Sequence, residues 1–123
     1  MNLRGITMIH QTFEQHINHA LEFFADYGFE IGQNNLALSQ PPCCQSCGWA
    51  EVATNELQCG EAFDNIVFYH DQDAVDLPAG EVFIAWSGHG NSIKSYFEKC
   101  DLNVEWNGDD SQRMKITSKG AAA

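Results

Sequence analysis

A run of five consecutive apolar residues, Val82–Trp86, places the strongest constraint on how this 123-residue chain can fold. Apolar side chains at every position predict a β-strand that is buried on both faces and therefore central in a sheet. A second run, Asn65–His70, is β-branched and aromatic and predicts a neighbouring strand. A polar connection that begins at Asp71 and closes at Leu77–Gly80 joins the two.

Further strands are predicted on both sides of this pair. Downstream, apolar residues alternate with Asn103 and Glu105, as in a half-buried strand. Asn107-Gly108 then predicts a hairpin turn, with a return strand at about Arg113–Thr117. The residues expected to point inward in these two strands are Leu102, Val104, Trp106, Met114 and Ile116. Two short extended segments, Phe29–Ile31 and Leu36–Leu38, are expected upstream, separated by a turn at Asn34-Asn35.

Three helices are predicted from apolar spacing of three and four residues. The first covers Thr7–Tyr27, with Thr7 as its N-cap and Gly28 just past its end. The second is capped by Ser46 and ends at Gly60. The third follows the turn Ser87–Ser92 and is capped by Asn91 or Ser92. The apolar stripes of the second and third helices are Trp49, Val52, Ala53 and Leu57, then Ile93, Phe97 and Cys100.

This order of elements predicts an α+β fold: a single two-layer domain with a mostly antiparallel sheet of four to five strands and helices packed on one face. The domain is expected to cover residues 1–119. We interpret residues 120–123, Gly-Ala-Ala-Ala, as a vector-derived tail.

Charge narrows the class of partner. The chain has 17 acidic and 6 basic residues and a net charge of −11, which disfavours nucleic acid and anionic membranes. The sequence shows no apolar run of the ~20 residues that span a bilayer and no signal peptide, so we expect a cytoplasmic protein with reduced thiols. A small molecule, another protein or a second copy of the chain stays possible as a partner.

Three of the five cysteines, Cys43, Cys44 and Cys47, lie within five positions. Cys44 and Cys47 have the CxxC spacing with which two thiolates can hold one zinc ion. Cys43 is a candidate third ligand, and His70 or Cys59 a candidate fourth. Adjacent cysteines point in different directions, so Cys43 and Cys44 seldom share a metal easily.

Two other interpretations of the cysteines stay open. A thiolate at Cys47 would be stabilised at a helix start, with Cys44 as a resolving partner for redox chemistry. Alternatively, the cysteines are small apolar residues that pack the helix start against the sheet, because free cysteine is among the most buried residue types.

A second polar cluster follows the strand at Asn65–His70. His70, beside Asp71, Gln72 and Asp73, can form a general base, a metal ligand or a polar pocket. The same residues can equally cap a turn, with His70 half-buried. His16 and His19 are i, i+3 neighbours that could hold a metal, but two ligands do not make a site, and a polar helix face is favoured.

The cysteine motif Cys43–Glu51 resembles a signature of a small bacterial family of unknown function. Three further motifs support the resemblance in the same order: Phe68–Asp73, Ile84–Trp86 and Val104–Gly108. The resemblance covers about Gly28–Thr117. It implies membership only, since it carries no activity, substrate or cofactor.

The sequence contains no complete catalytic constellation. It therefore favours a non-catalytic binding or interaction module without a cofactor. The alternative is a Cys/His site that holds structural zinc or carries out thiol redox chemistry.

Overall fold

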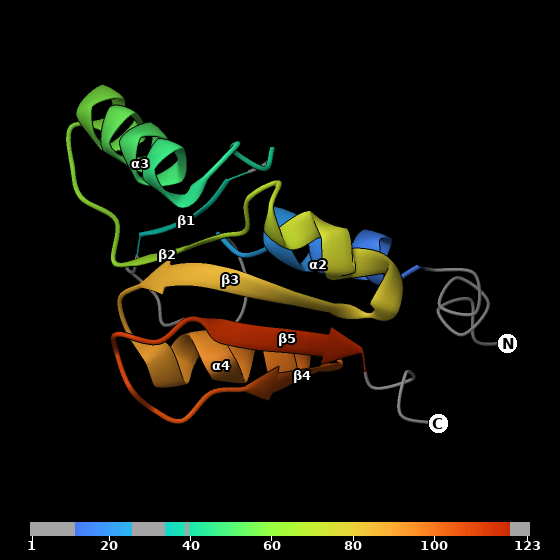
Figure 1. Ribbon diagram of the computed structural model, residues 1–123. Helices are drawn as coiled ribbons and strands as arrows, with labels where there is room; N and C mark the ends of the chain where they lie inside the picture. Colours follow the sequence, from blue (N-terminus) through green and yellow to red (C-terminus); the bar gives the residue numbers. More distant parts are fainter. Residues whose placement is uncertain (1–11, 26–33, 39, 119–123) are drawn as a thin grey trace, which may run out of the picture.

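The computed structural model describes residues 12–25, 34–38 and 40–118, which form helices around a five-stranded sheet (Figure 1). The α+β class and the strand number are confirmed. The elements are α2 (Phe13–Glu22), β1 (Asn35–Ala37), α3 (Gln45–Cys59), β2 (Asn65–Phe68), the 3₁₀ helix η1 (Asp73–Ala79), β3 (Glu81–Ser87), α4 (Gly90–Lys99), β4 (Leu102–Glu105) and β5 (Met114–Ser118).

The sheet is mixed, with the strand order β1-β2-β3-β5-β4. β1 runs parallel to β2, with Asn35 opposite Asn65, and the other three pairs are antiparallel. β3 is central, as its apolar run predicts, because it pairs with β2 on one side and β5 on the other, but it is not buried on both faces throughout, since Phe83 is exposed. Met114 and Ile116 of β5 are fully buried, which confirms their predicted inward orientation.

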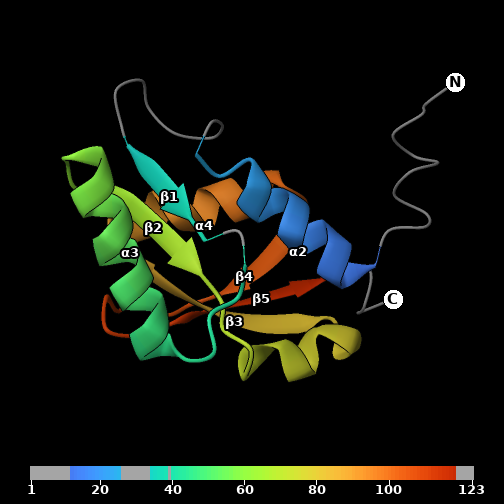
Figure 2. The same cartoon turned by 90° about the horizontal axis from the view of Figure 1, so that it is seen from above.

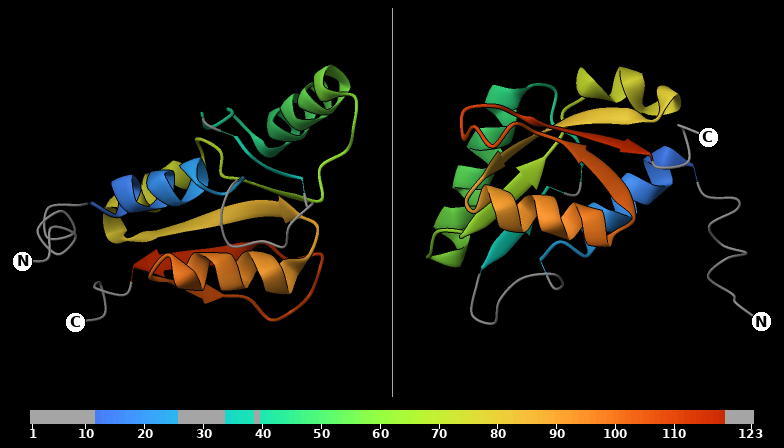
Figure 3. Two further views of the ribbon diagram at one scale, coloured as in Figure 1. Left: turned by 180° about the vertical axis from the view of Figure 1, so that it is seen from behind. Right: turned by 90° about the horizontal axis from the view of Figure 1, so that it is seen from below.

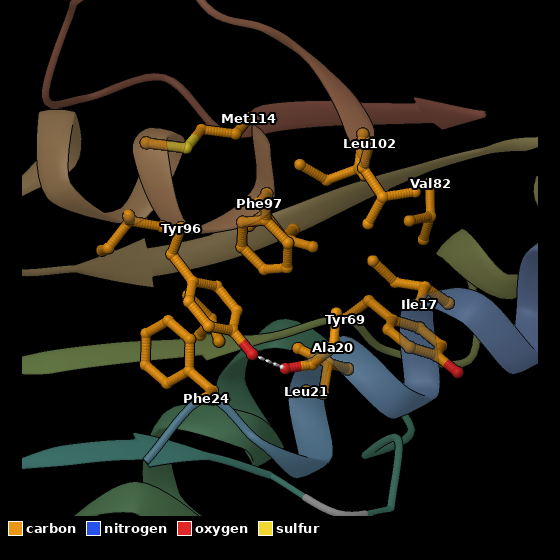
Figure 4. Packing of buried hydrophobic residues seen from close by; sticks show 14 of the residues in the cluster. Ile17, Ala20, Leu21, Phe24, Tyr69, Val82, Tyr96, Phe97, Leu102 and Met114 are labelled. Carbon is orange, nitrogen blue, oxygen red and sulfur yellow. Dashed lines mark hydrogen bonds between the residues drawn. The ribbon is translucent and has the colours of Figure 1, made fainter. Parts of the chain in front are cut away.

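The larger apolar cluster, here called the main core, lies where α2 and α4 pack on the sheet. Phe24 contacts the rings of Tyr96 and Phe97, and the Tyr96 hydroxyl donates to the carbonyl of Ala20 (Figure 4). This bond gives the buried hydroxyl a partner and joins α4 to α2. The buried residues of the main core are Ile17, Ala20, Leu21, Phe24, Val67, Tyr69, Leu77, Val82, Ile84, Ile93, Tyr96, Phe97, Leu102, Met114 and Ile116.

The helices do not all share one face, which differs from the expected two-layer arrangement. Val67 and Tyr69 belong to the main core, whereas Ile66 and Phe68, which alternate with them, face α3. The consecutive apolar residues of β2 are thus buried on both faces of the sheet. The α3 core consists of Leu38, Val52, Ile66, Phe68 and Ala85. Figure 2 shows α3 alongside β2, and Figure 3 shows it apart from α4.

Helix starts differ from the sequence prediction. α2 begins after Thr12, whose side chain forms a capping box with Gln15. The predicted cap Thr7, and Tyr27 and Gly28 at the predicted end, lie outside the described residues, but the helix itself ends at Glu22. Neither Asn91 nor Ser92 caps α4, because its N-cap is His89. The backbone N–H of His89 instead donates to the side chain of Asn65 at 2.8 Å, which fixes where α4 begins.

Strand ends also shift. Asn35 begins β1 instead of completing a turn, and β2 stops at Phe68, two residues before His70. β4 ends at Glu105, and the connection to β5 is longer than the two-residue turn that Asn107-Gly108 predicts. Trp106 lies in that connection, where its indole N–H donates to the carbonyl of Asp109. The predicted strand Phe29–Ile31 lies outside the described residues.

No helix in the described part of the chain combines the length and the apolar character needed to cross a membrane.

Candidate functional site

Cys44, not Ser46, is the N-cap of α3. Its backbone is extended (φ −155°, ψ 173°), and its sulfur accepts the backbone N–H of Cys47 at 3.4 Å. Its carbonyl accepts the N–H of Gly48 at 3.1 Å, which is the first bond of the helix. A thiol here takes the role that serine or aspartate usually has at a helix start. Cys47 lies in the first turn, as predicted.

The sulfurs of Cys43, Cys44 and Cys47 all lie within 4.8 Å of one another. The Cys43 and Cys47 sulfurs are in contact at 3.1 Å. The sulfurs of the adjacent residues Cys43 and Cys44 thus lie near each other, and whether the two residues share a metal stays a prediction. Cys43 pairs with the residue one helical turn ahead, and Cys44 caps the same turn. Together the three sulfurs form what we call the thiol cluster.

The thiol cluster faces solvent. Cys43 and Cys47 are exposed and Cys44 is partly exposed, so the interpretation of these cysteines as buried packing residues is wrong. The residues that pack α3 on the sheet are Val52, Gly48 and Trp49. Exposure leaves the sulfurs accessible to an ion or a thiol reagent.

The structure assigns the more acidic thiol to Cys44 rather than to Cys47. The backbone N–H of Cys47 stabilises the Cys44 thiolate and lowers the pKa of Cys44. Hydrogen bonds with Cys43 and Cys44, followed by repulsion between the thiolates, raise the pKa of Cys47 to about 12. The helix start thus stabilises a thiolate, but the stabilised residue is Cys44, which accepts the free N–H, and not the predicted Cys47.

An alkylation experiment distinguishes these thiols. With a limiting amount of iodoacetamide at neutral pH, we expect Cys44 to be modified well before Cys47, because the thiolate is the nucleophile. Peptide mapping by mass spectrometry after short exposures measures the order. Cys47 should stay largely unmodified until the pH approaches 12. Faster modification of Cys47 would contradict the assignment.

His70 lies on a segment that returns to the thiol cluster. The backbone N–H of Asp71 donates to the carbonyl of Pro42 at 2.8 Å, which joins the residue after His70 to the residue before Cys43. Among the described residues, however, no group of three or more metal ligands with mutual distances within 4.8 Å includes His70. The two predicted motifs therefore meet through their backbones, while the ring lies outside the thiol cluster.

His70 is 6% exposed, and its ring takes part in a network of polar side chains, here called the His70 relay. Its Nε2 lies 3.2 Å from Oδ2 of Asp73, and the same oxygen accepts a hydrogen bond from Arg113 at 2.7 Å. Asp71 and Gln72 are exposed, so only Asp73 of the predicted polar pocket joins His70. Sequence reasoning missed Arg113, which lies forty residues from Asp73 and carries no motif of its own.

The remaining candidate metal ligands lie away from the thiol cluster. Cys59 is the last residue of α3, about 20 Å from its start at 1.5 Å per residue, so it cannot share an ion with the thiol cluster. His16 lies at 2.6 Å from the carbonyl of Cys100 through Nε2, a structural contact between α2 and the end of α4. This contact supports the helix-face interpretation of His16 over the metal interpretation.

The fold and the site together define an α+β domain with a solvent-facing thiol cluster and a buried histidine relay beside it. The chain belongs to the family described as domain of unknown function DUF6891, whose profile matches residues 32–119. The matched range contains both the thiol cluster and the His70 relay, and it agrees with the resemblance to a family of unknown function. No curated protein and no solved structure matches the chain.

Proposed function

We propose that this domain is a metal-binding module, without catalysis of its own, that holds one thiophilic ion such as Zn²⁺ on Cys43, Cys44 and Cys47. The mutual distances of the three sulfurs, all within 4.8 Å, are the observation that supports the proposal. Tetrahedral zinc with Zn–S bonds of ~2.3 Å needs sulfurs about 3.8 Å apart. Small rotations of exposed side chains therefore suffice to bring the cluster to that spacing.

Electrostatics favour a cation at this position. The net charge of −11 raises the local concentration of cations near the surface. Zinc binds thiolates, so binding must release thiol protons. Cys44, whose pKa is lowered by the Cys47 N–H, is the ligand that loses its proton most readily and is the natural first contact. The proposal places the domain in a reducing compartment such as the cytoplasm, with neither nucleic acid nor membrane as its partner.

A metal titration of the full chain tests the proposal. Protein purified without chelator and kept reduced should bind one Zn²⁺ per chain, measured by elemental analysis and by competition with a chromophoric chelator. Replacing Cys44 or Cys47 with serine should weaken binding at least about 100-fold, because a thiolate ligand is lost. Cys59→Ser is the matched control, since it also removes one exposed thiol and should leave the affinity unchanged.

Two results would contradict the proposal. One is wild-type protein that takes up no zinc, cadmium or copper(I) under reducing conditions. The other is a catalytic turnover that disappears in Cys47→Ser, which would replace a binding module with an enzyme.

A second candidate function, thiol redox chemistry, is favoured by the 3.1 Å contact between the Cys43 and Cys47 sulfurs. With hydrogen peroxide as oxidant, these two thiols would form one disulfide while the peroxide is reduced to two waters. Mass spectrometry of non-reduced peptides after mild peroxide treatment tests this candidate. A Cys43–Cys47 disulfide in a protein that takes up no metal would favour redox chemistry over the metal site.

A further inference from the structure

The His70 relay fixes which ring nitrogen carries the proton. An ionised carboxylate only accepts hydrogen bonds, so the contact of Nε2 with Asp73 requires a proton on Nε2. Arg113 donates a charge-assisted hydrogen bond to the same carboxylate oxygen of Asp73, whose side chain is nine-tenths buried. In the neutral ring, Nδ1 is then the nitrogen with the free lone pair.

That lone pair has no partner among the described residues. Nδ1 of His70 is buried and receives no hydrogen bond, and it is the one side-chain nitrogen or oxygen of the described residues in that condition. Most buried polar atoms in proteins are satisfied, and an exception calls for a functional explanation. Metal-binding histidines often show this arrangement, in which one nitrogen donates to a carboxylate and the other is left free for the ion.

The position of the ring connects this nitrogen to the thiol cluster. The hydrogen bond between Asp71 and Pro42 holds the segment of His70 against the segment of Cys43. The residues from Pro41 to Cys44 have no regular secondary structure. Ligation by the ring therefore requires this turn to carry the sulfurs toward the ring, while Asp73 holds the ring in place.

We propose that Nδ1 of His70 supplies the fourth ligand to the ion that the thiol cluster holds, and that Asp73 and Arg113 are positioning residues that set its tautomer. This inference rests on the proposed metal-binding function. It assigns a Cys₃His donor set, typical of structural zinc sites. It also means that Arg113, which immediately precedes β5, acts on a site formed by the start of α3 and the segment that follows β2.

Nitrogen NMR of the metal-free protein tests the tautomer without any variant. In ¹⁵N-histidine-labelled protein near neutral pH, Nδ1 of His70 should show the chemical shift of an unprotonated nitrogen and Nε2 that of a protonated one. The spectrum of His70→Gln identifies the signals. The opposite pattern, with the proton on Nδ1, would overturn the inference.

Addition of one equivalent of ¹¹³Cd²⁺, a spectroscopic substitute for zinc, tests the ligation directly. The Nδ1 resonance should split by scalar coupling to the cadmium nucleus. Cadmium bound with no change at Nδ1 would refute the histidine ligand and leave the three-thiolate site intact. Failure to bind cadmium or zinc at all would instead refute the proposed function, so the two failures are distinguishable.

Variants test the positioning role. Asp73→Asn and Arg113→Gln should each weaken zinc binding about 10- to 100-fold, the range typical for residues that orient a metal-bound histidine. Asp73→Asn should also alter the His70 tautomer in the metal-free spectrum, because it removes the acceptor-only carboxylate, and a purely structural effect would not do this. Lys115→Gln is the matched control. Lys115 lies on β5, two residues from Arg113, and both side chains contact the ring of Phe83. Lys115 forms an ion pair with Glu81, whereas Arg113 pairs with Asp73. Equal weakening by Lys115→Gln would contradict the assignment.

Discussion

Gly48→Ala is expected to destabilise the domain by about 3 kcal/mol, the upper end of the usual range for an overpacked core. This expected loss of stability is opposite in sign to the effect of helix propensity, because alanine stabilises a helix by about 1 kcal/mol relative to glycine. A Cβ atom at Gly48 would lie 2.2–2.9 Å from three ring carbons of Phe68. Phe68 is fully buried and Trp49 packs edge-on against it, so the ring cannot move aside cheaply. Urea denaturation followed by circular dichroism measures the loss.

Two companion variants make the Gly48 result specific. Ser46→Ala changes an exposed residue in the same helical turn and should leave the free energy of unfolding within about 0.5 kcal/mol of wild type. Phe68→Leu in the Gly48→Ala background should restore part of the stability, because it removes ring atoms at the point of collision. A Gly48→Ala protein as stable as wild type would mean that α3 packs further from β2 than the structure shows.

Asn65→Ala is expected to cost about 3 kcal/mol, because it leaves two polar groups without their partner at about 1–3 kcal/mol each. Asn65 is fully buried at the start of β2. Its Nδ2 donates to Oδ1 of Asn35 at 2.7 Å, and its Oδ1 accepts the backbone N–H of His89 at 2.8 Å. One side chain thus joins β1, β2 and the start of α4. Thermal and urea unfolding measure the change.

Asn103→Ala supplies the control for the Asn65 experiment. Asn103 lies in β4 and is exposed, so the same substitution removes no buried hydrogen bond and should have little effect. If both alanine variants unfold at the same urea concentration as wild type, the buried amide network does not stabilise the fold as argued.

Sequence patterns predicted the parts of the fold in which burial alone decides the structure. The apolar run in β3 predicted a central strand, and alternation in β5 predicted that Met114 and Ile116 point inward. The sequence patterns failed to predict a helix boundary that depends on a side chain from a distant part of the chain. The N-cap of α4 is His89, whose backbone N–H is bound by Asn65, and no local cap residue reveals this. The placement of α3 on the second face depended on how β2 divides its apolar side chains Ile66, Val67 and Phe68 between two cores, which a run of consecutive apolar residues does not disclose.

The residue types of the candidate site could be predicted from the sequence, but the contacts between those residues could not. Three clustered cysteines and His70 could be selected from the sequence by residue type. The capping role of Cys44 depended on an extended backbone at that residue, and the role of Arg113 depended on the pairing of β5 with β3. Such contacts arise from tertiary structure and leave no periodic signal in the chain.

The division of the apolar residues into two cores has a consequence for hydrogen exchange. Among the described residues, the main core has fifteen buried members and the α3 core five. Less buried apolar area means a smaller free energy of local opening. The amides of α3 should therefore exchange through a sub-global opening that leaves α4, β3 and β5 closed. The thiol cluster lies at the start of α3, the helix that is expected to open first. An ion bound to the thiol cluster would therefore slow exchange along α3 more than anywhere else in the domain.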